Sequence, residues 1–376
     1  MNETILTNAT IVTRDEVFPG TLVLRGGTIA DVARGRSASS RAADFGGDLL
    51  IPGIVDVHTD NLERQVQPRV HARWPSRSAM LAHDAQCAAA GVTTVLDALC
   101  VGIVGFEHER TQTFREAVAD LDALGQKGVL RSDHFLHLRC ELPAPDMRDL
   151  FEPVCRHPAL RLLSVMDHTP GVGQYANLDR YRALRLKEGY SAEQIERSLA
   201  NRMAERERVR GPNRDFVLGV VGETGVAIAS HDDRTEEEVA ENAALGIRIS
   251  EFPVTLEAAK AAHGHGMGVI AGAPNIVRGG SHSGNVAVAD LLAADAVDAF
   301  ASDYVPASLV EAAFIAAATL GLPRAIAMVT ATPAAMAGLA DRGALATGLR
   351  GDLVRVRLHE GLPVVREAWR AGVRVA

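Results

Sequence analysis

Cysteine and aromatic residues are both scarce in this sequence. Only four cysteines occur among 376 residues, and no two of them form a Cys-x-x-Cys pair; they are Cys87, Cys100, Cys140 and Cys155. This spacing argues against structural zinc and predicts free or buried thiols in a reducing compartment. Aromatic residues make up 4% of the chain, whereas alanine, valine, leucine and glycine are plentiful. Such a composition suits helices packed on parallel strands.

Long apolar runs and an excess of positive charge are also missing. No stretch of about 18 apolar residues exists, and the N-terminal MNETILTNATIV has neither a basic start nor a long apolar segment. The sequence therefore predicts a cytoplasmic protein without a membrane span. Its net charge of -8 argues against general nucleic-acid binding, which requires a basic face. The charge remains compatible with a small anionic substrate bound by a few arginines and metal ions.

The middle of the chain alternates short apolar strands with helical stretches. Helices are expected at 76–90, 106–127, 234–245, 254–265 and 307–320, and strands at 52–58, 92–100, 133–141, 160–168, 224–231, 246–252, 267–273 and 297–303. Eight such units predict an α/β fold, a TIM-like (β/α)8 barrel over residues 51–339. Residues 1–50 and 340–376 instead alternate apolar and polar positions, which predicts one small β-sheet domain formed by both termini.

One segment is too long for an ordinary barrel connection. Residues 175–215 follow the fourth strand and contain ten Lys/Arg and seven Asp/Glu. We expect a helical insertion over the active-site end of the barrel. The alternative is a solvated helical pair without a role, since helices of mixed charge are usually exposed faces.

Possible metal ligands follow five of the eight predicted strands. Catalytic groups of such barrels lie at the C-terminal ends of the strands. One histidine or carboxylate there is weak support, but five strands at matching depth predict a metal site. The candidates are His58 and Asp60, Glu141, the pair Asp167-His168, the run His231-Asp232-Asp233, and Asp303.

Imidazoles and carboxylates in this combination suit a pair of divalent ions such as zinc, manganese or iron. Glu141 can bridge two ions because a carboxylate has two oxygens. A water bound between them loses a proton near neutral pH, and Asp303 can accept that proton. His58 and Asp60 stand two apart on an extended strand and so point the same way. A better-known hydrolase motif ends in His-x-His, so Asp60 keeps a ligand but makes it harder and more negative.

Two loops carry candidates for binding an anionic substrate. GAPNIVRGGSHSGN, residues 272–285, follows the seventh strand, where barrels commonly bind phosphate. Its backbone N–H groups, Ser281 and Arg278 can contact phosphate oxygens, and His282 can protonate a leaving group. The loop 61–79 after the first strand supplies Asn61 and Arg64 beside the predicted ligands. The plain alternatives are a glycine-rich turn and ordinary surface charge.

Other histidines are attributed to packing. His263-x-His265 has a ligand-like spacing, but it precedes the seventh strand and so belongs to the opposite end of the barrel. The pair at residues 83–84 falls within a helix. His134 and His137 lie lower on the third strand and are expected to line the barrel.

With these residues the sequence resembles the amidohydrolase superfamily. The similarity rests on IPGIVDVHTD after a small N-terminal sheet, on the histidines after the middle strands, on Asp303 and on the C-terminal GDLVRV. Within the superfamily the chain is similar to the diphosphatase family of the carbon–phosphorus lyase pathway of phosphonate metabolism. Stretches such as HTDNLERQ, SVMDHTPGVGQY and GAPNIVRGGSHSGN carry this similarity over nearly the whole barrel. Gln65 departs from the family pattern, in which a histidine is expected.

The resemblance implies a metal-dependent hydrolase that releases pyrophosphate from α-D-ribose 1-methylphosphonate 5-triphosphate and leaves the 5-phosphate. It implies that Asp303 is the base and that His282 and Arg278 contact the leaving phosphates, while Arg64, Ser281 and Asn61 lie near the substrate. It also implies the residues that bind the metal ions, which are His58, Asp60, Glu141, His168, His231 and Asp303. A homodimer is expected. One alternative is an amidohydrolase acting on a cyclic amide or a deaminase substrate, although the first strand lacks His-x-His and the fourth lacks a lysine. Another is a scaffold without catalysis, although such relatives typically lose the ligands.

Overall fold

Eight parallel strands form a barrel whose sheet order follows the chain. The computed structural model describes residues 3–69, 72–103, 109–172, 177–281 and 284–376. The barrel strands are β6 (Ile54–Thr59), β7 (Val92–Val101), β8 (Asp133–Glu141), β9 (Leu160–Met166), β10 (Ala227–His231), β11 (Ile249–Glu251), β12 (Gly268–Gly272) and β13 (Ala299–Ala301). Each overlaps one of the eight predicted strands, so the predicted (β/α)8 barrel is confirmed.

The barrel closes through the backbone of two predicted ligands. The Asp303 N–H donates to the His58 carbonyl at 3.0 Å, and the Asp60 N–H donates to the Asp303 carbonyl at 2.5 Å. Asp303 has a φ of +56°, in the left-handed region that residues with a Cβ seldom adopt. The contact that joins the first strand to the last therefore also fixes the backbone that carries Asp60 and Asp303.

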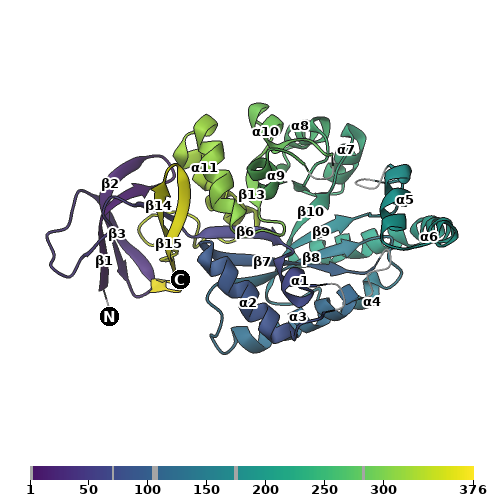
Figure 1. Ribbon diagram of the computed structural model, residues 1–376, viewed down its shortest axis with the longest axis horizontal. Coiled ribbons are helices and arrows are strands. Elements are labelled where there is room, and N and C mark those ends of the chain that lie inside the picture. The colour runs from purple at the N-terminus through teal and green to yellow at the C-terminus, as the bar shows by residue number, and fades with distance from the viewer. Residues whose placement is uncertain (1–2, 70–71, 104–108, 173–176, 282–283) are drawn as a thin grey trace.

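Helices cover the outside of the barrel (Figure 1). Those described are α1 (Asn61–Val66), α2 (Ser76–Ala89), α3 (Glu109–Gly125), α4 (Met147–Phe151), α7 (Glu236–Ala244), α8 (Leu256–Gly264), α9 (Ala273–Arg278), α10 (Val288–Ala293), α11 (Ser308–Leu320), α12 (Leu322–Ala327) and α13 (Ala331–Met336), besides two in the insertion. Leu136 and Leu138 of β8 belong to the core shared with the helices. Because strand side chains alternate, His137, Arg139 and Glu141 face the inside of the barrel.

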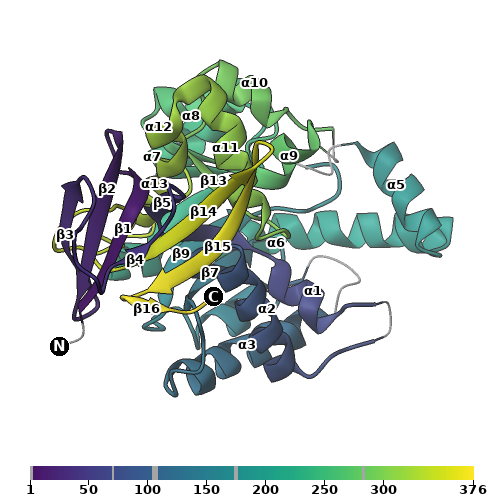
Figure 2. The same ribbon diagram turned by 60° about the vertical axis from the view of Figure 1, so that its left-hand side comes forward.

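Both ends of the chain contribute to a second sheet, which lies beside the barrel (Figures 1 and 2). Its strands are β1 (Glu3–Val12), β2 (Val17–Arg25), β3 (Thr28–Arg34), β4 (Ala43–Asp44), β5 (Leu49–Pro52), β14 (Leu353–His359), β15 (Leu362–Arg370) and β16 (Val373–Arg374). β5 pairs with both β1 and β14 and so joins the two ends. Gly53 alone separates β5 from β6, and a Cβ there would lie 2.8 Å from the Asp352 Cβ.

The insertion consists of α5 (Leu178–Lys187) and α6 (Ala192–Thr224), which lie at the far side of the barrel from the terminal sheet (Figure 1). α6 begins with a capping box between Ser191 and Gln194. It continues past the predicted end at 215 because Val217 and Val220 are buried in the barrel core. α6 is therefore both the insertion and the helix that connects β9 to β10. None of the helices in the described ranges has the length and apolarity that a membrane span requires.

Candidate metal centre

All six predicted metal ligands line one cavity of about 320 Å³ at the C-terminal ends of the strands. They come from five different strands or the residues just beyond them: His58 and Asp60 from β6 and its end, Glu141 at the end of β8, His168 after β9, His231 at the end of β10, and Asp303 after β13. Side chains that the sequence places at the ends of separate strands therefore meet in space.

The first cluster of possible ligand atoms belongs to His58, Asp60 and Asp303. One ligand atom from each lies within 4.8 Å of the others. His58 Nε2 is 3.7 Å from Asp60 Oδ1, and the His58 side chain is 1% exposed. A separation of this size between two ligand atoms leaves room for one cation between them.

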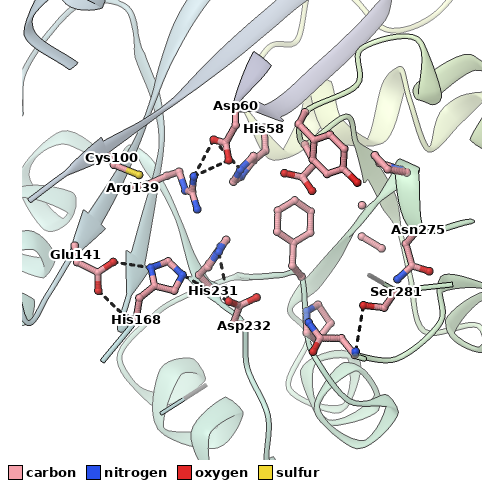
Figure 3. Close-up of a pocket in the computed structure, with 18 of the residues that line it drawn as sticks. His58, Asp60, Cys100, Arg139, Glu141, His168, His231, Asp232, Asn275 and Ser281 are labelled. Carbon is pink, nitrogen blue, oxygen red and sulfur yellow. Dashed lines mark hydrogen bonds and ion pairs between the residues drawn. The ribbon is translucent and has the colours of Figure 1, made fainter. Parts of the chain in front are cut away.

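The second cluster belongs to His168, His231 and Asp232 (Figure 3). Asp232 Oδ2 lies 3.7 Å from His168 Nε2 and 3.8 Å from His231 Nε2. Asp232 has a φ of +58°, like Asp303, and this backbone turn directs its carboxylate into the cavity. Asp232 follows His231 in the predicted strand-end run, but it was absent from the predicted ligand set.

Two glutamates orient the three histidines. Glu251, the last residue of β11, bonds His58 Nδ1 at 2.8 Å and His231 Nδ1 at 2.7 Å, and it accepts from Ser164 Oγ at 2.8 Å. Glu141 Oε2 bonds His168 Nδ1 at 2.6 Å, while Oε1 accepts from the His168 N–H at 2.7 Å. With each Nδ1 bonded to a glutamate, each Nε2 faces the cavity.

The position of Glu141 differs from the bridging arrangement expected of it. Both of its oxygens bond to His168, so in this arrangement it holds that ring in place. A direct bond from Glu141 to a metal stays a prediction. Glu251 was missed by the sequence analysis, although it is the second-last residue of the sixth predicted strand, 246–252, and its position near the strand end would have identified it.

The donor set fits divalent cations. Histidines that bind metals through Nε2 usually donate Nδ1–H to a carboxylate, as these three do. Two buried atoms in the clusters, His58 Nε2 and Asp232 Oδ2, make no hydrogen bond. Buried polar atoms are nearly always paired, so a bound cation at each cluster is indicated.

The electrostatics of the cavity also favour a bound cation. Burial lowers the pKa of the His58 and His168 rings, but the charges of Glu251 and Glu141 outweigh it and raise each pKa to about 10. Burial, aided by the charge of Asp60, raises the pKa of Asp303 to about 6. The field that stabilises a proton on the rings would equally stabilise a metal ion.

Arg139 explains the acid at position 60. Its Nη1 lies 2.8 Å and 3.0 Å from the two Asp60 oxygens, and the arginine side chain is 8% exposed. A buried guanidinium needs a carboxylate partner, which a second histidine could not supply. Burial raises the pKa of Asp60, but the Arg139 charge outweighs it, so the pKa falls below its ordinary value. Asp60 thus keeps a positive charge at the edge of the metal centre.

The predicted substrate-binding residues differ in whether they line the cavity. Ser281 lines the cavity and accepts from the Asn285 N–H at 3.1 Å. Arg278 is exposed at the end of α9 and is not among the described residues that line the cavity. His282 lies outside the described residues.

Arg64 and Asn61 contact residues beside or behind the cavity wall. Arg64 Nη1 donates to the Tyr304 carbonyl at 3.0 Å. The Asn61 amide donates to His83 Nδ1 at 2.9 Å and to Gln86 Oε1 at 3.0 Å. Neither residue is among the described residues that line the cavity. They are placed to support the backbone beside Asp60, because both belong to the short helix α1 that follows it.

Four arginines that were not predicted do line the cavity. They are Arg110 from α3, Arg139 from β8, Arg185 from α5 and Arg202 from α6. The insertion thus forms part of the wall of the site, as expected of a segment on this end of the barrel. Arg139 stands two residues before Glu141, so strand alternation could have identified it.

Three of the other histidines, His263, His83 and His134, have structural partners. His263 Nε2 in α8 lies within hydrogen-bond distance of Asp298 Oδ2, at 2.8 Å, away from the cavity. Asp97 of β7 bonds His83 Nε2 at 2.7 Å and His134 Nδ1 at 2.9 Å, and His134 Nε2 lies 3.2 Å from Asp84. This buried network connects one helix with two strands.

Replacing His134 by glutamine is expected to reduce stability by about 3–5 kcal/mol at pH 7, because it leaves buried carboxylates without their cation. Burial lowers the His134 pKa, but the charges of Asp97 and Asp84 outweigh the effect of burial and raise this pKa to about 10. The stability that His134 contributes to the wild-type protein is therefore fully present below the ordinary histidine pKa of about 6.5. It is lost as the pH rises through 10. The free energy of unfolding, measured in urea, should fall less between pH 7 and pH 10 for the variant than for the wild type. An exchange of exposed His359 for glutamine is the control, and an equal slope in variant and wild type would contradict this account.

Comparisons with known proteins first define the class. The chain superposes on 5-methylcytosine deaminase from Klebsiella pneumoniae liganded with 5-fluorocytosine with a TM-score of 0.66 at 17% identity, covering 99% of this chain and 97% of that one. A mutant of N-acetyl-D-glucosamine-6-phosphate deacetylase from Mycobacterium smegmatis gives a TM-score of 0.65 at 16% identity over 100% of both chains. These likenesses show that the chain shares the fold of these two proteins. No protein-family model matches the chain.

A full-length relative then defines the family. The α-D-ribose 1-methylphosphonate 5-triphosphate diphosphatase of Escherichia coli (strain K12) is 40% identical over 376 residues, which is 99% of this chain and 100% of that protein. The chain belongs to this diphosphatase family.

Proposed function

We propose that this chain hydrolyses α-D-ribose 1-methylphosphonate 5-triphosphate to the 5-phosphate and pyrophosphate. The observation that carries this is the full-length similarity to a diphosphatase with that substrate. The site agrees with it, because histidines and carboxylates suited to cations share one cavity with four arginines. The protein is accordingly a hydrolase of acid anhydrides.

The metal set is proposed from the two clusters. His58, Asp60 and Asp303 would hold one divalent ion, and His168, His231 and Asp232 a second, with Glu141 as a possible further ligand. Such ions would polarise the phosphoryl oxygens and lower the pKa of water. Zinc, manganese or iron all suit these donors.

The chain's own residues then account for the remaining steps. Water attacks the α-phosphorus, a new P–O bond forms, and the bond from the α-phosphorus to the bridging oxygen of pyrophosphate breaks. Asp303 accepts the water proton, and its pKa of about 6 leaves it ionised at neutral pH. Arg139, held at the cavity edge by Asp60, offsets charge that develops on the phosphoryl oxygens.

An amidohydrolase acting on a cyclic amide or a deaminase substrate is the second candidate. The superfamily fold alone favours it. The cavity does not, because Arg110, Arg139, Arg185 and Arg202 suit a polyanion better than a neutral ring. A cytoplasmic location, a homodimer, the absence of nucleic-acid partners and the choice of metal stay predictions of the sequence.

Chelation followed by reconstitution tests the proposal. We expect dialysis against a chelator to abolish hydrolysis of the ribose triphosphate and zinc, manganese or iron to restore it. Phosphorus NMR should then show pyrophosphate as the released product. Stepwise release of orthophosphate, or activity on a cyclic amide without activity on the triphosphate, would contradict it.

A further inference from the structure

A tyrosine and two arginines of the insertion form a buried group in the wall of the cavity. Tyr181 and Arg185 belong to α5 and Arg202 to α6, and all three line the cavity that contains the metal clusters. Their exposed fractions are 3%, 9% and 7%. Arginine is seldom buried to this extent unless its charge is paired.

The tyrosine holds both guanidinium groups. Arg202 Nη1 donates to the Tyr181 hydroxyl at 2.9 Å. The Arg185 guanidinium carbon lies 5.1 Å from the centroid of the same ring. The Tyr181 ring is itself packed against Ile195 and Leu199 of α6. The two arginines are therefore held in position before any ligand arrives.

The charges of this group favour an anionic ligand. Burial and the positive charge of Arg185 lower the pKa of Arg202. Glu188, the residue that follows α5, accepts from Arg185 Nη1 at 2.7 Å. Two like charges that share one tyrosine repel each other, and a ligand with more than one negative charge would relieve that repulsion.

The loop after β12 lies close to the same helix. A Cβ at Gly284 would be 3.3 Å from Arg180 Nη1, so the Arg180 side chain of α5 reaches this loop. Ser281 and Asn285 of the loop line the cavity together with the arginine group. The space between the insertion and the loop is thus part of the cavity that contains the possible metal ligands.

We propose that Arg185 and Arg202 form a polyphosphate subsite that binds the β- and γ-phosphates of the substrate, the part that leaves as pyrophosphate. This inference rests on the proposed function. The other anionic end of that substrate is a methylphosphonate ester, which has one ionisable oxygen and so one negative charge. Pyrophosphate carries several charges and oxygens, which suit two forked guanidinium groups. The subsite would also explain why a diphosphatase carries this insertion.

The test is calorimetric titration of the full-length, metal-loaded protein with two ligands. The first is pyrophosphate, with the divalent ion in excess so that chelation does not strip the site. The second is ribose 1-methylphosphonate 5-phosphate. We expect Arg202→Gln and Arg185→Gln each to weaken pyrophosphate binding at least tenfold and to leave binding of the ribose phosphate within twofold. Arg197→Gln is the matched control, because Arg197 lies on α6 with its side chain 67% exposed.

A variant that retains the charge guards against loss of the fold. Arg202→Lys should weaken pyrophosphate binding less than Arg202→Gln, and thermal melts should show that both variants are folded. Equal weakening for both ligands, weakening only for the ribose phosphate, or no change in either would overturn the subsite. Because binding is measured without turnover, the two hypotheses fail separately. A wild-type protein that releases no pyrophosphate would sink the proposed function, and unaltered pyrophosphate binding in the variants would sink the subsite alone.

Discussion

Asp303→Asn is expected to lower kcat by about a thousandfold, within the range that a general base contributes. Asparagine keeps the shape of the side chain but cannot accept the proton of water. Asp303 also carries the backbone bonds that close the barrel to His58 and Asp60, which the exchange leaves in place. The loss should therefore appear in steady-state kcat with little change in the thermal melting temperature.

Asp290→Asn is the matched control, because Asp290 is an exposed aspartate on α10. It should leave kcat unchanged. A variant of Asp303 that retained more than a tenth of wild-type kcat with normal metal content would show that another group accepts the proton. A variant that lost activity only by unfolding would assign the residue to barrel closure.

Glu251→Gln is expected to weaken metal binding by about 10- to 100-fold, the range typical of groups behind metal-binding histidines. One Glu251 carboxylate bonds Nδ1 of both His58 and His231, so the loss of its charge affects both clusters. Burial raises the Glu251 pKa, but the histidine charges outweigh it and hold that pKa well below its ordinary value. Glutamine removes this charge and presents a single oxygen acceptor.

Metal content after dialysis and competition with a chelator would measure this effect. Glu257→Gln is the control, because Glu257 lies in the first turn of α8 and is exposed. Excess metal should restore most of the activity of the Glu251 variant, which separates weakened binding from loss of a reacting group. Undiminished metal affinity would contradict the role of Glu251 in orienting the rings.

The fold and part of the site can be predicted from the order of residues along the chain. Parallel strands in a barrel end at the same face, so the side chains at their ends, His58, His168, His231 and Asp303, are expected together without coordinates. Glu251 also ends a strand, β11, but the predicted strand extends one residue further, to Phe252, so the acid does not stand at its predicted end. Asp232 was named in the run at the end of the fifth predicted strand but was left out of the ligand set. Its left-handed backbone turns the carboxylate into the cavity, and no sequence pattern specified that conformation.

The arginines show that proximity to the ligands in sequence does not determine which side chains line the cavity. Arg64 and Asn61 follow the ligands directly, but α1 directs them toward Tyr304 and α2. Arg185 and Arg202 are 17 positions apart and belong to two helices, yet Tyr181 brings them together in the cavity wall. Mixed charge along the insertion could not distinguish these two buried side chains from the exposed ones around them. The tertiary packing of the insertion determines which of its arginines are buried.

The position of an oxygen label tests the central claim most directly. The metal-loaded protein would be incubated with α-D-ribose 1-methylphosphonate 5-triphosphate in ¹⁸O-water and the products followed by phosphorus NMR. Attack at the α-phosphorus predicts unlabelled pyrophosphate and one ¹⁸O on the ribose 5-phosphate. Label in pyrophosphate would place the attack at the β-phosphorus, and labelled orthophosphate would place it at the γ-phosphorus. Either result would contradict the proposed geometry of the centre.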